Sequence, residues 1–436
     1  MNLKKNIFFW SSLNKEEKYK VLVRPVYKKK KVVSDSVYSI INSVKKFKDD
    51  SLYYYTKIFD KKKIKDFRIS KKKIQNSNFL VSPEIKKSIF LAKKNIEKFH
   101  KLQVYENIDV EIQKGIRCQK IFLPIEKIGL YIPGGSAPLI STVLMLAIPA
   151  RIAKCKNIIL CSPPSISNEI LYAAHICGIK KIYSVGGAQA IAAMAYGTNV
   201  IPKVHKIFGP GNAYVTEAKR QVNNVYNGTS IDMLAGPSEL VVIADNNANA
   251  NFISFDLLSQ AEHGPDSQVL LLTSSISLLE NVIKNIEINI QKSKRKDIIY
   301  ASLKKSRFIL AKNILECVEI SNIYSPEHLI INTKNPRTLL EKIKNAGSVF
   351  LGPWSPESAG DYASGTNHVL PTGGYSRSIS GLGVNDFKKS ISVQELTRQG
   401  LQSISDTVQT LSFFEDLQEH KNSISVRMQS EKETIY

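Results

Sequence analysis

The sequence predicts an α/β protein in which helices cover two parallel sheets. From about residue 121, short apolar runs end in small-residue loops and lead into segments with helical spacing. Strands that alternate with helices in this order are typical of parallel sheets. The 436 residues are enough for about two to four structural units, and no apolar run approaches the roughly 18 residues of a membrane span.

The first hundred residues predict a basic helical lead-in. Apolar side chains recur at helical spacing over 34–60 and 82–103. Residues 1–101 hold 28 Lys and Arg against 9 Asp and Glu, which gives them +19 of the net charge of +23. We interpret these charges as solvated helix faces. Nucleic-acid binding is the alternative, but lysine runs such as Lys61–Lys63 lack the interleaved aromatic side chains of such a surface.

Two α/β units and a tail follow along the chain. The first unit has expected strands at 128–132, 157–161, 181–185 and 204–208 and a helix at 213–224. The second has expected strands at 240–244, 269–273, 306–310 and 328–332 and helices at 249–263 and 275–292. Beyond Leu382 the pattern predicts mainly helix. This tail is too short to bury a large core of its own, so it must dock on another surface.

The five cysteines point to a reducing compartment. They are odd in number and none is spaced as C-x-x-C, so neither a disulfide framework nor a cysteine zinc site is indicated. The apolar stretch within Met1–Trp10 is too short for the core of a signal peptide. We therefore expect a cytosolic protein with reduced and mostly buried thiols.

A metal site is suggested around Gln260 and His263. The two residues lie three apart at the end of a helical pattern, so both side chains project from one face toward the Gly264-Pro265 loop. Asp361 lies in a loop rich in Gly, Ser and Asn that ends at His368, and functional sites are often built from polar loops beside a rigid sheet. A lone Q-x-x-H is more often structural, so the metal interpretation depends on these partners.

Glu327 and His328 are candidates for acid–base chemistry. They follow Pro326 and begin an expected strand. Adjacent side chains point apart in an extended strand, so both reach one cleft only if the backbone turns there. A solvated carboxylate beside a capping histidine is the alternative interpretation.

Two glycine turns are candidate nucleotide loops. Gly186-Gly187 and Gly209-Pro210-Gly211 each follow an expected strand and precede an expected helix. Glycine lets a ligand approach the backbone, and a helix N-terminus favours an anionic group. The sequence contains no G-x-G-x-x-G, and either turn alone is more often a plain strand–helix connection.

Taken together, these motifs resemble the histidinol dehydrogenase family over residues 120–425. The matching segments are 131–138, 186–190, 209–212, 236–239, 259–268, 325–329 and 360–368. Two positions depart from the family pattern: Lys48 stands where Gly is usual, and Leu234 where Pro is common. Neither position carries chemistry.

The resemblance implies two incomplete Rossmann-like domains, one inserted in the other, with a short N-terminal arm and a helical C-terminal extension. The arm is expected at 1–24 and the extension at 382–436. A first domain with most of the metal and catalytic site is expected at 25–130 and 240–381, and an NAD-binding domain at 131–239.

The resemblance also implies an activity and a set of site residues. The activity is oxidation of L-histidinol through L-histidinaldehyde to L-histidine with two NAD⁺, the last steps of histidine biosynthesis, by a homodimer whose subunits share the active site. The catalytic residues would be Glu327 and His328. The ligands of one Zn²⁺ per subunit, which also contact substrate, would be Gln260, His263, Asp361 and His420. Further substrate contacts would be Ser238, His328, His368 and Glu415, and the NAD⁺ contacts Tyr131, Gln189 and Asn212.

Two alternatives stay open from the sequence. Another zinc-dependent polyol or amino-alcohol dehydrogenase on the same scaffold would carry similar residues. A nucleic-acid-binding protein with a vestigial enzyme fold would use the basic first hundred residues instead, and its binding would be sensitive to salt.

Overall fold

The computed structural model describes residues 3–24, 30–134, 139–234 and 236–430, so the end of the expected motif at 131–138 lies outside the described residues. The chain divides into two compact units, one of residues 1–103 and 125–387 and one of residues 104–124 and 388–436. Among the described residues, no helix combines the length and the apolar character needed to cross a bilayer.

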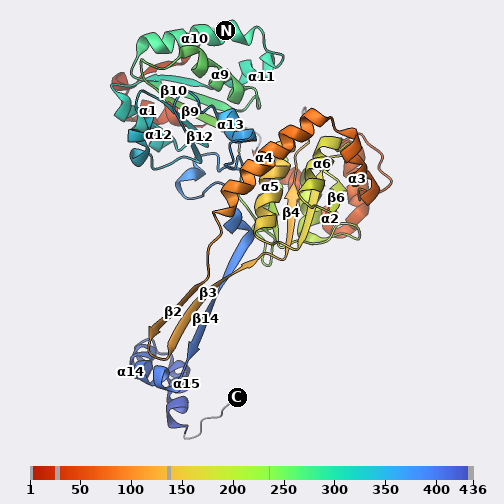
Figure 1. The fold of residues 1–436 in the computed structure, drawn as a ribbon, viewed down its shortest axis with the longest axis vertical. Helices are drawn as coiled ribbons and strands as arrows, with labels where there is room; N and C mark the ends of the chain where they lie inside the picture. The colour runs from red at the N-terminus through yellow and green to blue at the C-terminus, as the bar shows by residue number, and fades with distance from the viewer. Residues whose placement is uncertain (1–2, 25–29, 135–138, 235, 431–436) are drawn as a thin grey trace. The chain divides into compact units, whose positions relative to one another are not determined.

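A six-stranded parallel sheet lies in the first unit (Figure 1). Its order is β1-β11-β10-β9-β12-β13, with β9 buried along its whole length between β10 and β12. The strands are β1 Ile7–Phe9, β9 Glu239–Ala244, β10 Gln268–Thr273, β11 Arg307–Leu310, β12 His328–Asn332 and β13 Ser348–Leu351. The helices of this region are α1 Lys15–Leu22, α9 Ala250–Ala261, α10 Ile276–Ile290, α11 Lys296–Leu303, α12 Ile314–Tyr324 and α13 Glu357–Tyr362. The four strands expected here are confirmed, and β1 adds a strand from the expected N-terminal arm.

A five-stranded parallel sheet forms the other half of this unit. Its order is β6-β5-β4-β7-β8, so the first strand in sequence, β4, lies at the centre. The strands are β4 Lys127–Tyr131, β5 Asn157–Ser162, β6 Lys181–Ser184, β7 Lys206–Phe208 and β8 Ser230–Ile231, and the helices between them are α5 Ile140–Ile152, α6 Asn168–Ile176, α7 Gly187–Tyr196 and α8 Ala213–Asn223. The chain changes direction across the sheet between β4 and β7, and ligands of open α/β sheets bind at such points, beyond the carboxyl ends of the strands.

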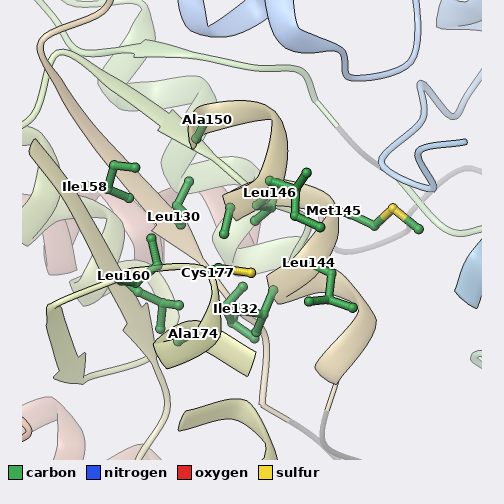
Figure 2. Packing of buried hydrophobic residues seen from close by; sticks show 14 of the residues in the cluster. Leu130, Ile132, Leu144, Met145, Leu146, Ala150, Ile158, Leu160, Ala174 and Cys177 are labelled. Atoms are coloured by element: carbon green, nitrogen blue, oxygen red, sulfur yellow. The ribbon is translucent and has the colours of Figure 1, made fainter. Parts of the chain in front are cut away.

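The core between this sheet and α5 is packed with aliphatic side chains (Figure 2). Leu130 of β4 and Leu160 of β5 belong to the same buried cluster as Leu144 and Leu146 of α5. All of α5 from 142 to 150 is buried, because α4 and α6 pack against it as well. Burial of each such leucine contributes roughly 1.5–3 kcal/mol to folding, which fixes the central strand.

Three basic helices cover the five-stranded sheet. They are α2 Lys30–Phe59, α3 Lys71–Leu80 and α4 Pro83–Lys101, and they pack on α7 and α8, on α6 and on α5 respectively. The expected grouping of residues 25–130 with 240–381 in one domain stays a prediction. The apolar face of α2, built on Val37, Ile41 and Val44, joins the core of the five-stranded sheet. An amphipathic pattern shows that a helix docks but does not specify which sheet it covers.

The second unit is an antiparallel sheet with two helices. The strand order is β14-β3-β2, with β14 Lys388–Leu396, β3 Ile116–Pro124 and β2 Ile108–Gln113, followed by α14 Arg398–Phe414 and α15 Gln418–Gln429. Residues 388–396 lie in the tail that was expected to be mainly helical, and they pair along their length with β3, from Lys388 opposite Pro124 to Leu396 opposite Ile116. Their alternation of Ile391 and Val393 with polar residues is the period of a strand. Leu411, Phe413 and Phe414 of α14 are largely exposed in this unit.

Lys48, which stands where the family usually has Gly, has an unusual backbone conformation. The helix α2 is kinked at this residue, whose backbone has φ 48° and ψ −121°, in a region that favours glycine. Its Nζ donates a hydrogen bond to the carbonyl oxygen of Gly197 at 3.3 Å. The side chain therefore has a contact, but the backbone is strained.

Substitution Lys48→Gly should raise the free energy of unfolding by about 1 kcal/mol, because a non-glycine residue in this region costs about 1–3 kcal/mol and the lost side-chain contact offsets only part of that. Urea unfolding monitored by circular dichroism measures the change. As a control, Lys46→Gly, at an interior position of α2, should lower it by about 1 kcal/mol. A decrease for Lys48→Gly as large as that of the control would contradict this account.

Candidate active site

A cavity of about 810 Å³ lies at the amino ends of the central strands of the six-stranded sheet. Ser238 precedes β9, Ser267 precedes β10, and Glu327 and His328 lie at the start of β12, and all four line the cavity. Thr142 of α5 contributes from the five-stranded half of the same unit. The cavity therefore collects polar side chains from several elements that are far apart in the sequence.

The backbone of Glu239 positions both Glu327 and His328. Its N–H donates to Glu327 Oε2 at 2.9 Å, and its carbonyl oxygen lies 3.1 Å from His328 Nδ1. The chain turns just before this pair, because Ser325 caps α12 in the left-handed region at φ 57°. With this turn, the side chains of Glu327 and His328 both face one cavity, which the sequence alone could not show.

His328 is held as a neutral imidazole. Burial lowers its pKa to about 3, below the near-neutral value expected for an exposed histidine. Because Nδ1 lies on the Glu239 carbonyl oxygen, it carries the proton and Nε2 carries the lone pair. Nε2 has no hydrogen-bond partner among the described residues and lies 3.9 Å from Asp361 Oδ1. The free nitrogen is thus the one available to accept a proton.

Three carboxyl groups share this buried region. Burial raises the pKa of Glu327 and Glu357 well above the usual value, and Asp361 adds to both shifts by charge repulsion. Burial also raises the pKa of Asp361 to about 6, although nearby His263 opposes the shift. Carboxylates so placed are unfavourable without a cation, and a bound cation would favour their ionised forms.

His263, Glu357 and Asp361 form a possible metal-binding cluster. One ligand atom from each lies within 4.8 Å of the others, and His263 Nε2 lies 4.0 Å from Asp361 Oδ2. Both amide atoms of buried Gln260 lack a hydrogen-bond partner among the described residues, as does Glu357 Oε2. Carboxylate oxygens beside an imidazole are donors that a divalent cation such as Zn²⁺ accepts, so His263, Glu357 and Asp361 fit a metal.

Glu357 was missed by sequence reasoning. It begins α13 four residues before Asp361, so the two side chains share one face of the helix. Its Oε1 lies 3.6 Å from His328 Nδ1, the same distance as Glu327 Oε2 from that atom. The spacing to Asp361 is the signal that could have found it.

His368 and Ser238, two expected substrate contacts, line the same cavity. His368 Nδ1 lies 2.8 Å from the carbonyl oxygen of Asp361, and its Nε2 lies 3.3 Å from Thr142 Oγ1. Glu415 and His420, the remaining expected residues, belong to the second unit, where both are exposed. Glu415 caps the end of α14 and His420 lies in the first turn of α15.

A second cavity, of about 840 Å³, lies at the carboxyl ends of β4 and β5. It is lined by the three expected NAD⁺ contacts, Tyr131, Gln189 and Asn212. The Tyr131 hydroxyl accepts a hydrogen bond from Gly187 N–H at 3.0 Å, at the start of α7. Gln189 Oε1 is buried without a partner among the described residues, which leaves it available to a ligand.

A buried ion pair between Lys219 and Asp232 fixes the Gly209–Gly211 loop beside this cavity. Lys219 Nζ contacts Asp232 Oδ1 and donates to the carbonyl oxygen of Gly209 at 2.9 Å. Asp232 Oδ2 accepts from Gly209 N–H at 2.7 Å. The loop then ends at Asn212, whose side chain caps α8. Pro133 and Asn212 line both cavities, so the two meet at these residues.

Comparisons with known proteins agree with this arrangement. A family model described as histidinol dehydrogenase matches residues 23–428. A histidinol dehydrogenase of Buchnera aphidicola subsp. Acyrthosiphon pisum is 58% identical over 424 residues, which are 97% of this chain and 98% of the relative. That of Escherichia coli strain K12 is 51% identical over 427 residues, 98% of each chain.

A solved structure is similar as well. The crystal structure of histidinol dehydrogenase from Elizabethkingia anophelis matches with a TM-score of 0.93 at 47% identity, over 97% of this chain and 98% of that chain. Sequence, fold and length thus agree from end to end. The chain belongs to the histidinol dehydrogenase family.

Proposed function

We propose that the chain oxidises L-histidinol through L-histidinaldehyde to L-histidine in the cytosol, as the last steps of histidine biosynthesis, and reduces two NAD⁺. The main support is the pair Glu327 and His328, which one backbone residue holds at a cavity shared with His263 and Asp361. The relatives named as histidinol dehydrogenases match over nearly the whole chain. An imidazole and a carboxylate at one carbon suit an alcohol oxidation followed by an aldehyde oxidation.

We further propose that Gln260, His263, Asp361 and His420 hold one Zn²⁺ per active site. The unpartnered amide of Gln260, the raised pKa of the buried Asp361 carboxyl and the position of His263 Nε2 4.0 Å from Asp361 Oδ2 support the first three. His420 follows from the family pattern. When bound, the metal would orient the substrate by binding the nitrogen atoms of the substrate. It would also neutralise the nearby carboxylates.

His328 would accept the proton in the first oxidation. The hydroxyl proton of L-histidinol passes to Nε2 as a hydride leaves the carbinol carbon for NAD⁺, which produces the aldehyde. The imidazolium that forms is buried, and the ionised forms of Glu327 and Glu357, each with an oxygen 3.6 Å from Nδ1, would stabilise it.

Glu327 would act in the second oxidation. Water adds to the aldehyde carbon and its proton passes to the Glu327 carboxylate. A second hydride then leaves the same carbon for a second NAD⁺, and loss of the remaining protons gives the carboxylate of L-histidine. Burial raises the pKa of Glu327 and so makes its ionised form a stronger base than an exposed carboxylate.

The second unit supports a shared active site. Its sheet and helices bury few apolar side chains, and Leu411, Phe413 and Phe414 remain exposed. An exposed apolar face of this kind favours association with another surface. With the family pattern, this supports a homodimer in which Glu415 and His420 come from the partner subunit.

Removal of the metal should abolish turnover. Strong chelation should reduce activity to background, and added Zn²⁺ should restore it. Asp361 must lose its proton to bind a metal, and burial raises its pKa to about 6, so metal affinity should fall as the pH drops below about 6. Metal content measured by mass spectrometry should fall in His263→Asn and stay unchanged in His175→Asn, an exposed histidine on α6. Full activity of metal-free protein would refute the assignment.

Substitutions of the two proposed bases, Glu327 and His328, should slow different half-reactions. Wild-type protein should form two NADH per L-histidinol consumed, and formation of none would refute the proposed activity. Glu327→Gln should slow oxidation of L-histidinaldehyde by roughly 10²–10⁴-fold and the alcohol step much less, while His328→Asn should slow the alcohol step by a similar factor. Single-turnover kinetics with each substrate measure both. Equal losses in both steps for both variants would contradict the division of roles.

Complementation tests the shared site. His420→Asn and Asp361→Asn should each be inactive, yet their co-expression should restore part of the activity. A mixed dimer would contain one site with both wild-type ligands and one site with neither. Differently tagged subunits, purified in tandem, isolate the mixed dimer. If that dimer shows no activity, His420 acts within its own subunit.

A further inference from the structure

The cavity lined by Tyr131 and Gln189 has few charged side chains among its described lining residues. Among the described residues that line it, Asp60 is the only charged side chain, and no Lys or Arg contributes. Lys61, Lys62 and Lys63 follow directly in the sequence, but they are exposed and none lines the cavity. A ligand there meets a single negative charge and no compensating positive one.

Asp60 lies on a different element from the acidic residue of many nucleotide-binding sheets. Those sheets usually carry an acidic residue at the end of the second strand, where it accepts hydrogen bonds from a ribose. Here the second strand, β5, ends at Ser162 and continues into Pro163-Pro164, so no carboxylate lies at that point. Asp60 instead enters from the end of α2, which packs on α7 and α8.

One oxygen of the Asp60 carboxyl group has no hydrogen-bond partner in the part of the chain that the structure describes. This oxygen, Oδ2, is buried, while the backbone N–H of Asp60 is bonded to the carbonyl oxygen of Thr56 at 3.1 Å. Burial raises its pKa, and Asp60 in turn contributes to the raised pKa of Tyr131. A carboxylate placed in this way gains most from a ligand that donates O–H groups, as two adjacent ribose hydroxyls do.

The position of Asp60 indicates which ribose it meets. The reacting end of a dinucleotide must reach His328 in the first cavity, and the two cavities meet at Pro133 and Asn212. The adenosine end then extends into the second cavity, where Asp60 lies. The adenosine ribose is the one that carries an extra 2′-phosphate in NADP⁺.

We propose that Asp60 accepts hydrogen bonds from the adenosine ribose hydroxyls and excludes a 2′-phosphate, so that it selects NAD⁺ over NADP⁺. This inference rests on the proposed function, because it assumes that the second cavity binds the nucleotide. A phosphate at the same point would meet the carboxylate and would find no cation among the described lining residues.

The test compares NAD⁺ and NADP⁺ in direct binding by calorimetry and in turnover with L-histidinol. Wild-type protein should prefer NAD⁺, and Asp60→Asn should weaken NAD⁺ binding by roughly 10- to 100-fold, since hydrogen bonds to a charged group are worth about 1.5–3 kcal/mol. The ratio of kcat/KM values for NAD⁺ and NADP⁺ should fall by at least about tenfold, with kcat for NAD⁺ changed much less. Asp50→Asn, an exposed position on α2, removes the same charge and should leave the ratio unchanged.

A second measurement needs no variant. Wild-type protein should bind 2′-deoxy-NAD⁺, which lacks the adenosine 2′-hydroxyl, about tenfold or more weakly than NAD⁺. Equal affinity for the two, or an unchanged NAD⁺ to NADP⁺ ratio in folded Asp60→Asn, would overturn the role of Asp60 and leave the proposed function intact. Binding of NAD⁺ without oxidation of L-histidinol would refute the proposed function, and the binding ratios would still decide the role of Asp60. Binding of neither nucleotide would overturn both.

Discussion

Glu239, the first residue of the central strand β9, is the point on which the active site depends. Its backbone N–H and carbonyl oxygen hold Glu327 and His328, and its side chain pairs with Arg24 and accepts from Gly373 N–H at 3.2 Å. Arg24 also donates to the carbonyl oxygens that end α12, at 2.8 Å to Tyr324 and 3.2 Å to Ser325. Because β9 pairs with β10 and β12 on either side, the sheet fixes Glu239, and Glu239 fixes the side chains of Glu327 and His328.

This arrangement buries acidic groups in a place where they do not stabilise the fold. Glu327 and Glu357 are buried and Asp361 is nearly so, and each has a raised pKa. Buried carboxyls with few donors lower the stability of the empty fold, and such unfavourable groups persist mainly at functional sites. The large aliphatic cores of the two sheets offset this cost. The packing around the site therefore compensates for the unfavourable burial of these carboxyl groups.

The sequence allowed the parallel sheets to be predicted and left parts of the site open. Strands such as Glu239–Ala244 are buried on both faces, so they are continuous apolar runs that stand out from their surroundings. Residues 388–396 are exposed on most positions, so only a weak alternation marked them as a strand. The orientation of Glu327 and His328 depended on the left-handed conformation of Ser325, which no pattern revealed. Asp60 lines the same cavity as Tyr131 only because α2 docks on α7 and α8, and docking of this kind is not encoded locally.

The basic helices α2, α3 and α4 have a consequence for how fast a nucleotide arrives. Residues 1–101 hold most of the net positive charge of the chain, and these helices cover the sheet that bears the second cavity. A surface of this sign attracts the negatively charged pyrophosphate of a dinucleotide from a distance and raises the rate of encounter. Salt screens such attraction over about 10 Å at 0.1 M ionic strength, whereas contacts inside the cavity are screened much less. If the nucleotide binds in the second cavity as proposed, ionic strength acts on its association rate, while the lining of the cavity governs its residence time.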